Sequence, residues 1–374
     1  MANAVTLFNP GDRSPRIEWA WKSNVDPWLT TEPNQWNSYS DIEADIIERA
    51  YQKGLPEVVL DDYHIVFKEF VQISNSSEHQ QRPVKRIVHE RDQEPRLRKE
   101  RFLAEPIVPN ICFSKNPRCT PFFEEFHEKF PNLDDPIFND SKRQKLVLKA
   151  ADGLIEEGKK LGKQKEGEYM AELLHMVEDG TVDQVYACCA YLYCKESFLY
   201  KKLNECMRLV VDPDHYQVWR SKVSTFGPFA QLLYVLKFDT DQEAPFYDIE
   251  QEASVFNDNQ KTPLFETKQE TPLTVYRGTN LPPVTIEQFQ STKDKIQFTA
   301  FTSTSRSRSK AEHCGGNVLF IIDVAEEDGR DVSSYSGYDE EEHLLHPGFF
   351  CFVKSCIPSQ NAAKWEIHLR STSL

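Results

Sequence analysis

The hydrophobic pattern changes its period well along the chain, and this change most constrains the fold. Between residues 118 and 236, apolar side chains recur at three- and four-residue spacing, which is typical of helices. Beyond Pro272 the apolar runs become short and typical of strands. Helices followed by a block of strands predict an α+β domain. We expect helices at 122–130, 142–161, 166–178, 182–209 and 229–238, and strands at 273–276, 297–302, 317–324, 343–345, 349–353 and 365–369.

A tryptophan-rich module precedes this domain. Four of the six tryptophans lie between positions 19 and 36. The alternation at Trp19-Ala20-Trp21 predicts a strand, and helical spacing over 41–53, closed by Gly54, predicts one helix. Further strands are expected at 58–60 and 63–67. The pattern indicates a small, strand-rich module with one helix.

Charge is unevenly distributed. The net charge is −15, which argues against bulk binding of DNA by phosphate neutralisation. Residues 82–101 are nevertheless locally basic, with eight Lys or Arg against four Asp or Glu. An acidic loop is expected at 239–270. We therefore divide the chain into a module at 12–90, a linker at 91–110 and a domain at 111–374, whose helical part runs to about 240 and whose β core spans 271–374.

Cysteine usage and hydropathy bear on the compartment. The nine cysteines form no CxxC pair, so we expect free thiols in a reducing compartment and no zinc site. We see neither a secretory signal at the start nor an apolar run long enough to cross a membrane. We expect a protein that is intracellular, cytoplasmic or nuclear, without a membrane partner.

Three polar segments end or turn predicted strands in the β core: Thr274–Gly278, Phe301–Ser305 and Tyr338–Leu345. Taken singly, Arg277 is an ordinary surface cation, Ser303 a solvated strand end and the acidic triplet a turn. In an extended chain, however, Glu340 and Glu342 point to the same face. Two carboxylates so placed repel, and we expect one to titrate high or to face a cation.

In their order and combination, these segments resemble the arginine-specific ADP-ribosyltransferase family, whose signature is R-S-ExE. The matching stretches are VYRG, AFTSTS and EEEHLL, and the resemblance covers about residues 110–370. It implies that NAD⁺ is the substrate, that no metal takes part, and that a protein with an exposed arginine is the acceptor. Loss of nicotinamide passes through an oxocarbenium-like transition state, as in glycoside hydrolysis.

The resemblance also implies roles for single residues. Glu342 would bind the ribose 2′-hydroxyl, and Ser303 would fix its rotamer. Glu340 would orient and help deprotonate the incoming guanidinium, which does not lose its proton unaided. Arg277 would bind the NAD⁺ pyrophosphate, and Gly278 would offer its backbone to the nicotinamide carboxamide.

Neighbouring residues extend the predicted site. Tyr335 and Tyr338 precede the acidic triplet and would contact the acceptor, although tyrosines that pack a turn are an equal alternative. His343 and His346 depart from the family pattern. At a spacing of three they would lie on opposite faces of a strand, which argues against a metal pair.

The tryptophan-rich module resembles the WWE domain, which in several members binds poly(ADP-ribose). The resemblance runs through Trp19, Trp21, Trp36, Glu48 and a basic tail at 82–86. It implies a ligand site, although core tyrosines and a solvated tail remain the alternative, and Lys85 or Arg86 would add a second cation for phosphate. The positions that match the ligand contacts of binding members are Tyr39, Tyr63, Gln72 and Arg82.

Together, the patterns lead us to expect a mono-ADP-ribosyltransferase that modifies protein arginines and is recruited through poly(ADP-ribose). Two alternatives stay open. One is an NAD⁺ glycohydrolase, in which water replaces arginine. The other is a non-catalytic ADP-ribose reader whose transferase fold has lost its activity.

Overall fold

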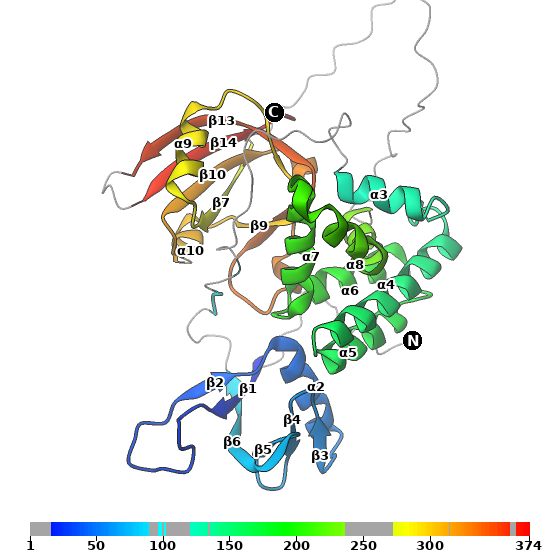
Figure 1. Ribbon diagram of the computed structural model, residues 1–374, viewed down its shortest axis with the longest axis vertical. Coiled ribbons are helices and arrows are strands. Elements are labelled where there is room, and N and C mark those ends of the chain that lie inside the picture. Colours follow the sequence, from blue (N-terminus) through cyan, green and yellow to red (C-terminus); the bar gives the residue numbers. More distant parts are fainter. Residues whose placement is uncertain are drawn as a thin grey trace, which may run out of the picture.

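The computed structural model describes residues 16–89, 96–98, 101, 120–133, 135–235, 272–313, 315–359 and 364–374. Figure 1 shows three bodies that follow one another along the chain: a module in blue and cyan, a group of helices in green, and a sheet region in yellow to red. The helix of the module lies next to the green helices, and the sheet region lies beyond them. The expected acidic loop at 239–270 lies outside the described residues.

The module is an antiparallel sheet with one helix, as the sequence predicts. Its strand order is β2-β1-β6-β5-β4-β3. Helix α2 begins with a capping box between Ser40 and Glu43. It packs Ile47 against the fully buried Trp19 and Ile65. The elements are β1 (Arg16–Lys22), β2 (Trp36–Ser38), α2 (Asp41–Gln52), β3 (Glu57–Val59), β4 (Tyr63–Val66), β5 (Val71–Ser74) and β6 (Ser77–His89).

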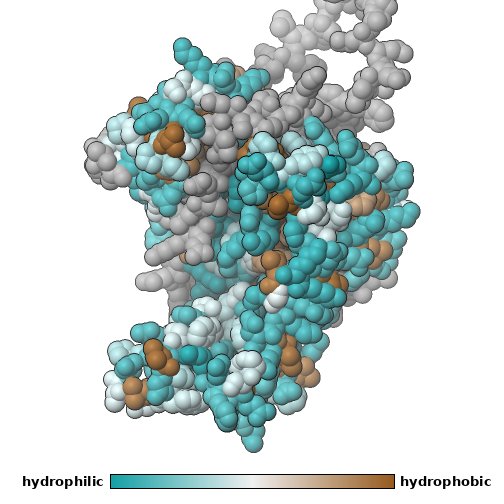
Figure 2. All heavy atoms as spheres, viewed as in Figure 1, coloured by the Kyte–Doolittle hydropathy of each residue, from teal (hydrophilic) through white to brown (hydrophobic). Residues whose placement is uncertain are grey.

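A half-buried carboxylate ties this core together. Glu48 accepts a hydrogen bond from Trp19 Nε1 at 2.9 Å and pairs with Arg86 through two bonds of 2.8 Å. Arg86 thus serves the module's own structure, and the expected second cation for phosphate, Lys85 or Arg86, stays a prediction. At the other end of β1, the loop to β2 exposes Val25, Trp28 and Leu29, and Figure 2 shows brown over this loop at the lower left.

The green helices form the largest hydrophobic core, around Phe122, Leu146, Tyr193 and Phe226. The single helix expected over 182–209 is wrong: the chain breaks after Cys194, because the Ser197 hydroxyl caps a new helix by accepting from Leu199 N. The elements are α3 (Pro121–Lys129), α4 (Asp140–Lys160), α5 (Gln164–His175), α6 (Val182–Cys194), α7 (Phe198–Arg208) and α8 (Tyr216–Val235). No helix among the described residues is both long and apolar enough to cross a membrane.

The sheet region is mixed, with strand order β11-β12-β9-β7-β10-β14-β13-β8. Among the strands that the structure describes here, β10 and β14 alone pair in parallel. The run expected at 297–302 divides between β8 and β9, and β11, α9 and α10 were not expected. The elements are β7 (Leu273–Thr279), α9 (Pro283–Ser291), β8 (Ile296–Phe298), β9 (Thr302–Ser305), α10 (Arg308–His313), β10 (Val318–Val324), β11 (Gly329–Asp331), β12 (Glu342–Leu345), β13 (Phe349–Pro358) and β14 (Trp365–Ser371). The α+β prediction is confirmed.

Helix α2 docks the module onto the green helices through its acidic first half. Asp45 pairs with Lys195 at 2.9 Å and accepts from the Tyr191 hydroxyl at 2.9 Å. Asp41 accepts from Glu196 N at 2.7 Å. Carboxylates near a helix N-terminus also interact favourably with the helix dipole, so the sequence of α2 suits both its own stability and this contact.

Candidate active site

Three adjacent strands bring the predicted residues of the transferase motif together. Strand β9 pairs with both β12 and β7. Arg277 lies on β7, Ser303 on β9 and Glu342 at the start of β12. Arg277 Nη1 donates to the carbonyl oxygen of Ser303 at 2.7 Å, and the Ser303 side chain hydrogen-bonds Glu342. The three motif residues, far apart in sequence, therefore form one contiguous site across β7, β9 and β12.

The acidic triplet is not a regular strand. Glu341 has a φ of 48°, in the left-handed region, and β12 begins only at Glu342. The hydroxyl of Ser305 donates to the Glu340 carbonyl at 2.6 Å and anchors the turn. Glu340 and Glu342 are both fully buried, whereas Glu341 pairs with Lys310 at the surface. The prediction that Glu340 and Glu342 share one side is confirmed, although a turn rather than strand alternation produces it.

An arginine of the linker binds the Glu340 carboxylate. Arg98 Nε lies 3.1 Å from both carboxylate oxygens of Glu340, and its Nη2 bonds Glu340 Oε2 at 2.5 Å. The Arg98 backbone N–H donates to Glu340 Oε1 at 2.7 Å. Its Nη1 donates to the carbonyl of Cys194, the last residue of α6, at 2.7 Å. This guanidinium therefore joins the sheet to the C-terminal end of a helix, where the dipole favours a cation.

A second linker arginine binds the Glu342 carboxylate. Arg101 Nη2 donates to Glu342 Oε1 at 2.9 Å, and Arg98 Nη2 reaches Glu342 Oε2 at 3.1 Å. Arg101 Nη1 also donates to the Tyr193 carbonyl at 3.2 Å. The Arg101 guanidinium lies 4.1 Å from the ring centre of Tyr200. Both oxygens of Glu342 are thus bound by cations from the linker.

The electrostatics of Glu342 follow from these neighbours. Burial raises the pKa of its carboxyl group, but the positive charges of Arg101 and Arg98 and the Ser303 hydrogen bond outweigh it, so the pKa is lowered overall. The two arginines thus offset the cost of burying the Glu342 charge in a site of almost no solvent exposure. The sequence led us to expect that one of the paired carboxylates would either titrate high or face a cation. The structure shows that they face a cation.

The ring of Tyr338 lies against the guanidinium of Arg98. Its ring centre lies 4.0 Å from the Arg98 guanidinium carbon and 4.1 Å from that of Arg96. Its hydroxyl donates to Asp41 Oδ2 at 2.9 Å, and Asp41 also pairs with Arg96 at 3.1 Å. Tyr338 therefore contacts a guanidinium, but one of this chain. Tyr335, the other tyrosine predicted to meet an acceptor, packs edge-on against Tyr186 of α6.

Gly278 is needed for a different reason from the one expected. A Cβ at this position would lie 2.4 Å from the Ala311 carbonyl oxygen and 2.9 Å from that of Gly315. The close approach is thus between β7 and the end of α10. No contact of the Gly278 backbone with a ligand is needed to explain the glycine.

The linker arginines were not predicted as part of the site. We interpreted 82–101 as the end of a domain and a linker whose basic charge suits a phosphate-rich ligand. The structure instead buries Arg98 and Arg101 between the sheet and α6. The only signal in the sequence is the reversal of charge within a strongly acidic chain, because a pairing across about 240 positions leaves no local spacing.

The predicted reader residues also lie together, at one end of the module. The Tyr39 hydroxyl donates to Gln72 Oε1 at 2.6 Å, and the Tyr39 and Tyr63 ring centres are 5.7 Å apart. Gln72 faces Arg82 across the β5–β6 pairing. Arg82 donates to the backbone carbonyls of Lys22 and Asn24, at 2.9 and 2.7 Å.

The green helices reach the edge of this cluster. Glu43 accepts from the Tyr63 hydroxyl at 2.9 Å and pairs with Lys163, the residue before α5, at 3.3 Å. Lys163 also pairs with Glu166, whose pKa is raised to about 6, mainly because it is buried. The cluster of Tyr39 and Tyr63 therefore lies where the module meets the green helices.

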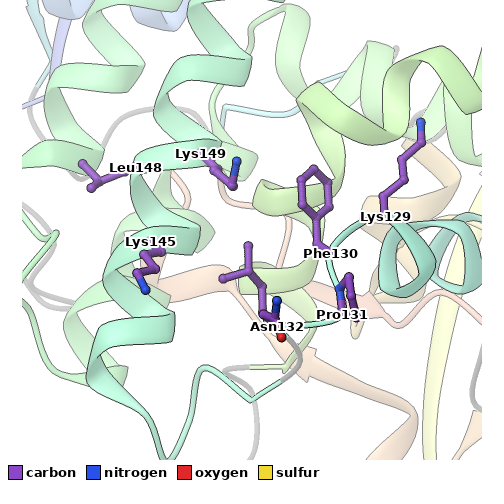
Figure 3. A pocket seen from close by; sticks show the side chains of 8 residues that line it. Lys129, Phe130, Pro131, Asn132, Lys145, Leu148 and Lys149 are labelled. Carbon is purple, nitrogen blue, oxygen red and sulfur yellow. The ribbon is translucent and has the colours of Figure 1, made fainter.

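One hollow of about 330 Å³ lies elsewhere, between the end of α3 and helix α4. Figure 3 shows Phe130, Pro131 and Asn132 on one side and Lys145, Leu148 and Lys149 on the other. None of the motif residues lines it, so its position carries no argument for the chemistry. Within the described ranges, no group of three His, Cys, Asp or Glu side chains could hold a metal ion.

Comparison with known families agrees with both motifs. Residues 17–86 match the WWE domain, and residues 260–373 match the NAD:arginine ADP-ribosyltransferase domain. The second match leaves out helices α3 to α8. Both resemblances are confirmed at the level of these domains.

Single proteins give narrower matches. The chain is 39% identical over 89 residues to a Mycobacterium avium (strain 104) protein, Mav, named as a candidate NAD(+)–arginine ADP-ribosyltransferase. That match covers 22% of this chain and only 10% of the relative's length.

Solved structures of the same class superpose weakly. Exoenzyme S from Pseudomonas aeruginosa is 15% identical, with 62% of this chain and 90% of that one covered and a TM-score of 0.35. The type III effector XopAI from Xanthomonas axonopodis pv. citri is 12% identical, with 72% and 95% covered and a TM-score of 0.36. At these scores neither carries an argument for the site.

Proposed function

We propose that this chain, which carries an N-terminal WWE domain and a C-terminal NAD:arginine ADP-ribosyltransferase domain, transfers ADP-ribose from NAD⁺ to arginine side chains of proteins. One observation carries the proposal: Glu340 and Glu342 lie side by side, fully buried, and together bind a guanidinium. A site that binds a guanidinium beside a second carboxylate has the groups that this reaction needs.

The chemistry assigns one task to each carboxylate. The bond from the ribose anomeric carbon to nicotinamide breaks, and nicotinamide leaves with the electron pair. Glu342 stabilises the cationic ribose through its 2′-hydroxyl, with Ser303 holding the carboxylate in place. A guanidinium nitrogen then attacks the anomeric carbon, and Glu340 takes up its proton. Arg277 is the candidate cation for the pyrophosphate, once its bond to the Ser303 carbonyl is exchanged.

The WWE domain is proposed to bind poly(ADP-ribose) through Tyr39, Tyr63, Gln72 and Arg82. Their clustering supports this: Tyr63, Gln72 and Arg82 are half-buried and lie together, and the buried Tyr39 holds Gln72 through its hydroxyl. Adenine stacks on an aromatic ring, and Arg82 suits phosphate. The expected intracellular location is kept as part of the proposal. It is supported by the free state of the described cysteines, which suits a reducing compartment.

The test is incubation with labelled NAD⁺ and an arginine-rich acceptor. Because Arg98 and Arg101 bind the carboxylates of Glu340 and Glu342, we would assay both wild type and Arg98→Gln/Arg101→Gln. Glu342→Gln should abolish nicotinamide release and labelling, whereas Glu340→Gln should abolish labelling and spare NAD⁺ hydrolysis. A chain that consumes no NAD⁺ in either form contradicts the proposal.

The same assay separates the alternatives. Release of free ADP-ribose without labelling of any acceptor would identify an NAD⁺ glycohydrolase. Poly(ADP-ribose) binding without NAD⁺ binding in either form would identify a reader whose transferase domain is inactive. Calorimetry with each ligand supplies the second measurement.

A further inference from the structure

The arginine segment, which we define as Arg96, Leu97, Arg98 and Arg101, is held by backbone as well as side-chain bonds. Arg96 N donates to Asp339 Oδ2 at 2.9 Å, and Asp339 N donates to the Arg96 carbonyl at 3.0 Å. Together with the Arg98 N–H bond to Glu340, these contacts fix the main chain along the acidic triplet. The segment is therefore bound as a peptide is bound, and is not a side chain that happens to reach an acidic patch.

Its contacts coincide with those that the reaction requires. Arg98 presents its guanidinium to Glu340, the carboxylate proposed to orient an acceptor arginine, and stacks on Tyr338. Arg101 binds Glu342, which the ribose of NAD⁺ must reach. Glu340 and Glu342 are fully buried beneath these two arginines. NAD⁺ and this segment cannot occupy Glu342 together.

From this geometry we infer that the arginine segment is a pseudosubstrate of its own transferase domain. Arg98 occupies the acceptor position on Glu340, and Arg101 excludes NAD⁺ from Glu342, so the chain holds itself inactive until the segment leaves. The inference rests on the proposed function and adds its regulation. It also defines the acceptor subsite as Glu340, the Tyr338 ring and the Cys194 carbonyl.

The WWE domain secures the closed form. Asp41, the first residue of α2, pairs with Arg96 at 3.1 Å and accepts from the Tyr338 hydroxyl. Tyr39, a proposed poly(ADP-ribose) contact, lies two residues before Asp41 in the chain. A ligand that shifts this end of α2 would thus loosen the segment, which couples the reader to the transferase site.

The first test measures NAD⁺ binding by calorimetry, which needs no turnover. Arg98→Gln/Arg101→Gln should bind NAD⁺ at least about tenfold more tightly than wild type, because a site open only part of the time loses affinity in proportion. The matched control, Arg308→Gln/Arg370→Gln, removes the same charge from arginines outside the site and should equal wild type. Arg98→Lys/Arg101→Lys keeps the charge but loses the bidentate geometry, and should lie between.

The second test asks whether the segment is docked at all. Trypsin should cut after Arg98 slowly in wild type and at least about tenfold faster in Glu340→Gln/Glu342→Gln, because only the released segment is accessible. Circular dichroism would verify that each variant is folded. Equal cleavage in both chains would overturn the inference.

The third test supplies the segment in trans. A peptide of residues 94–103, EPRLRKERFL, should inhibit acceptor labelling by the opened chain, and the same peptide with Gln at 98 and 101 should not. The inference is overturned if the opened chain binds NAD⁺ no better than wild type, or if Arg98 of the peptide becomes modified at the rate of a true acceptor. If neither chain binds NAD⁺, the proposed function fails with the inhibitory role, and cleavage by trypsin alone decides whether the segment binds there.

Discussion

Asp41 links the WWE domain to the arginine segment, and Asp41→Asn should weaken that link without changing the size of the side chain. In the structure, Asp41 pairs with Arg96 at 3.1 Å and accepts from the Tyr338 hydroxyl at 2.9 Å and from Glu196 N at 2.7 Å. Burial raises the pKa of this carboxyl group, but Lys195 and Arg96 outweigh it, so its pKa is lowered and it is charged at neutral pH. Asparagine keeps an acceptor oxygen and loses this charge.

The expected effect follows from the value of a hydrogen bond to a charged group. Such bonds contribute about 1.5–3 kcal/mol each. The Arg96 side chain is 28% exposed, and solvent screening favours the lower end of that range. Loss of about 1.5 kcal/mol raises the population of the released segment roughly tenfold, since 1.4 kcal/mol corresponds to a factor of ten.

Two measurements follow this population. The rate of tryptic cleavage after Arg98 should rise roughly tenfold, because proteolysis of a transiently opened segment tracks its equilibrium population. Nicotinamide release at low NAD⁺ should rise by the same factor.

Asp45→Asn provides the comparison. Asp45 contacts Lys195 and Tyr191 and pairs with none of the described residues of the arginine segment, so this change loosens the domain contact alone. It should leave cleavage after Arg98 within about twofold of wild type. The reasoning is refuted if Asp41→Asn is cleaved by trypsin and releases nicotinamide at the wild-type rates. It is refuted equally if Asp45→Asn is cleaved as fast as Asp41→Asn, because Asp41 would then not act through Arg96.

Two further predictions concern the sheet. Burial lowers the pKa of His343 from its ordinary value of 6.5 to about 4. As pH falls, the unfolded chain therefore binds a proton first, and the free energy of unfolding should decrease between about pH 6.5 and about pH 4 by up to about 3 kcal/mol. Urea unfolding of wild type and His343→Gln should show this as a difference that depends on pH. A difference that stays flat with pH would contradict the burial argument. Gly278→Ala should destabilise the transferase domain by about 1–3 kcal/mol, because the new methyl group would meet backbone oxygens of the α10 turn. Gly337→Ala, where a Cβ meets nothing within 4 Å, should leave the thermal midpoint unchanged, and equal midpoints for both variants would refute the packing account.

Local patterns predicted most of the elements, and the exceptions have local causes. The helix expected over 182–209 divides because Ser197 competes for the backbone as an N-cap, although apolar spacing continues through the break. Strand β11 is three residues long, too short for any alternation to be read. The acidic triplet depends on a left-handed Glu341, a conformation that strand periodicity cannot predict.

Only the motif residues of the site could be predicted from the sequence. The order of Arg277, Ser303 and Glu342 located three strands that prove to be neighbours. The antiparallel pairing of β9 with β7 and with β12 brings the three residues together. Arg98 and Arg101 were not predictable in this way. A basic stretch next to a linker is usually solvated, and nothing in its spacing distinguishes arginines that enter a site formed about 240 residues later.

The proposed arginine acceptor would itself explain why such a segment can bind so well. Two carboxylates in a site of almost no solvent exposure must be paired with cations, since removing one partner of a buried pair costs about 3–5 kcal/mol. When NAD⁺ and acceptor are absent, either water enters or another cation takes their place. A guanidinium from the chain satisfies Glu340 by the same bidentate geometry that would select a substrate, and it does so at the high effective concentration of a tethered ligand. After single replacement of Arg101, Arg98 alone should still compensate part of the Glu342 charge. The population of the released segment should therefore rise less than in the double variant. The proposed selectivity for arginine and the proposed self-inhibition by arginine thus rest on one arrangement of charges.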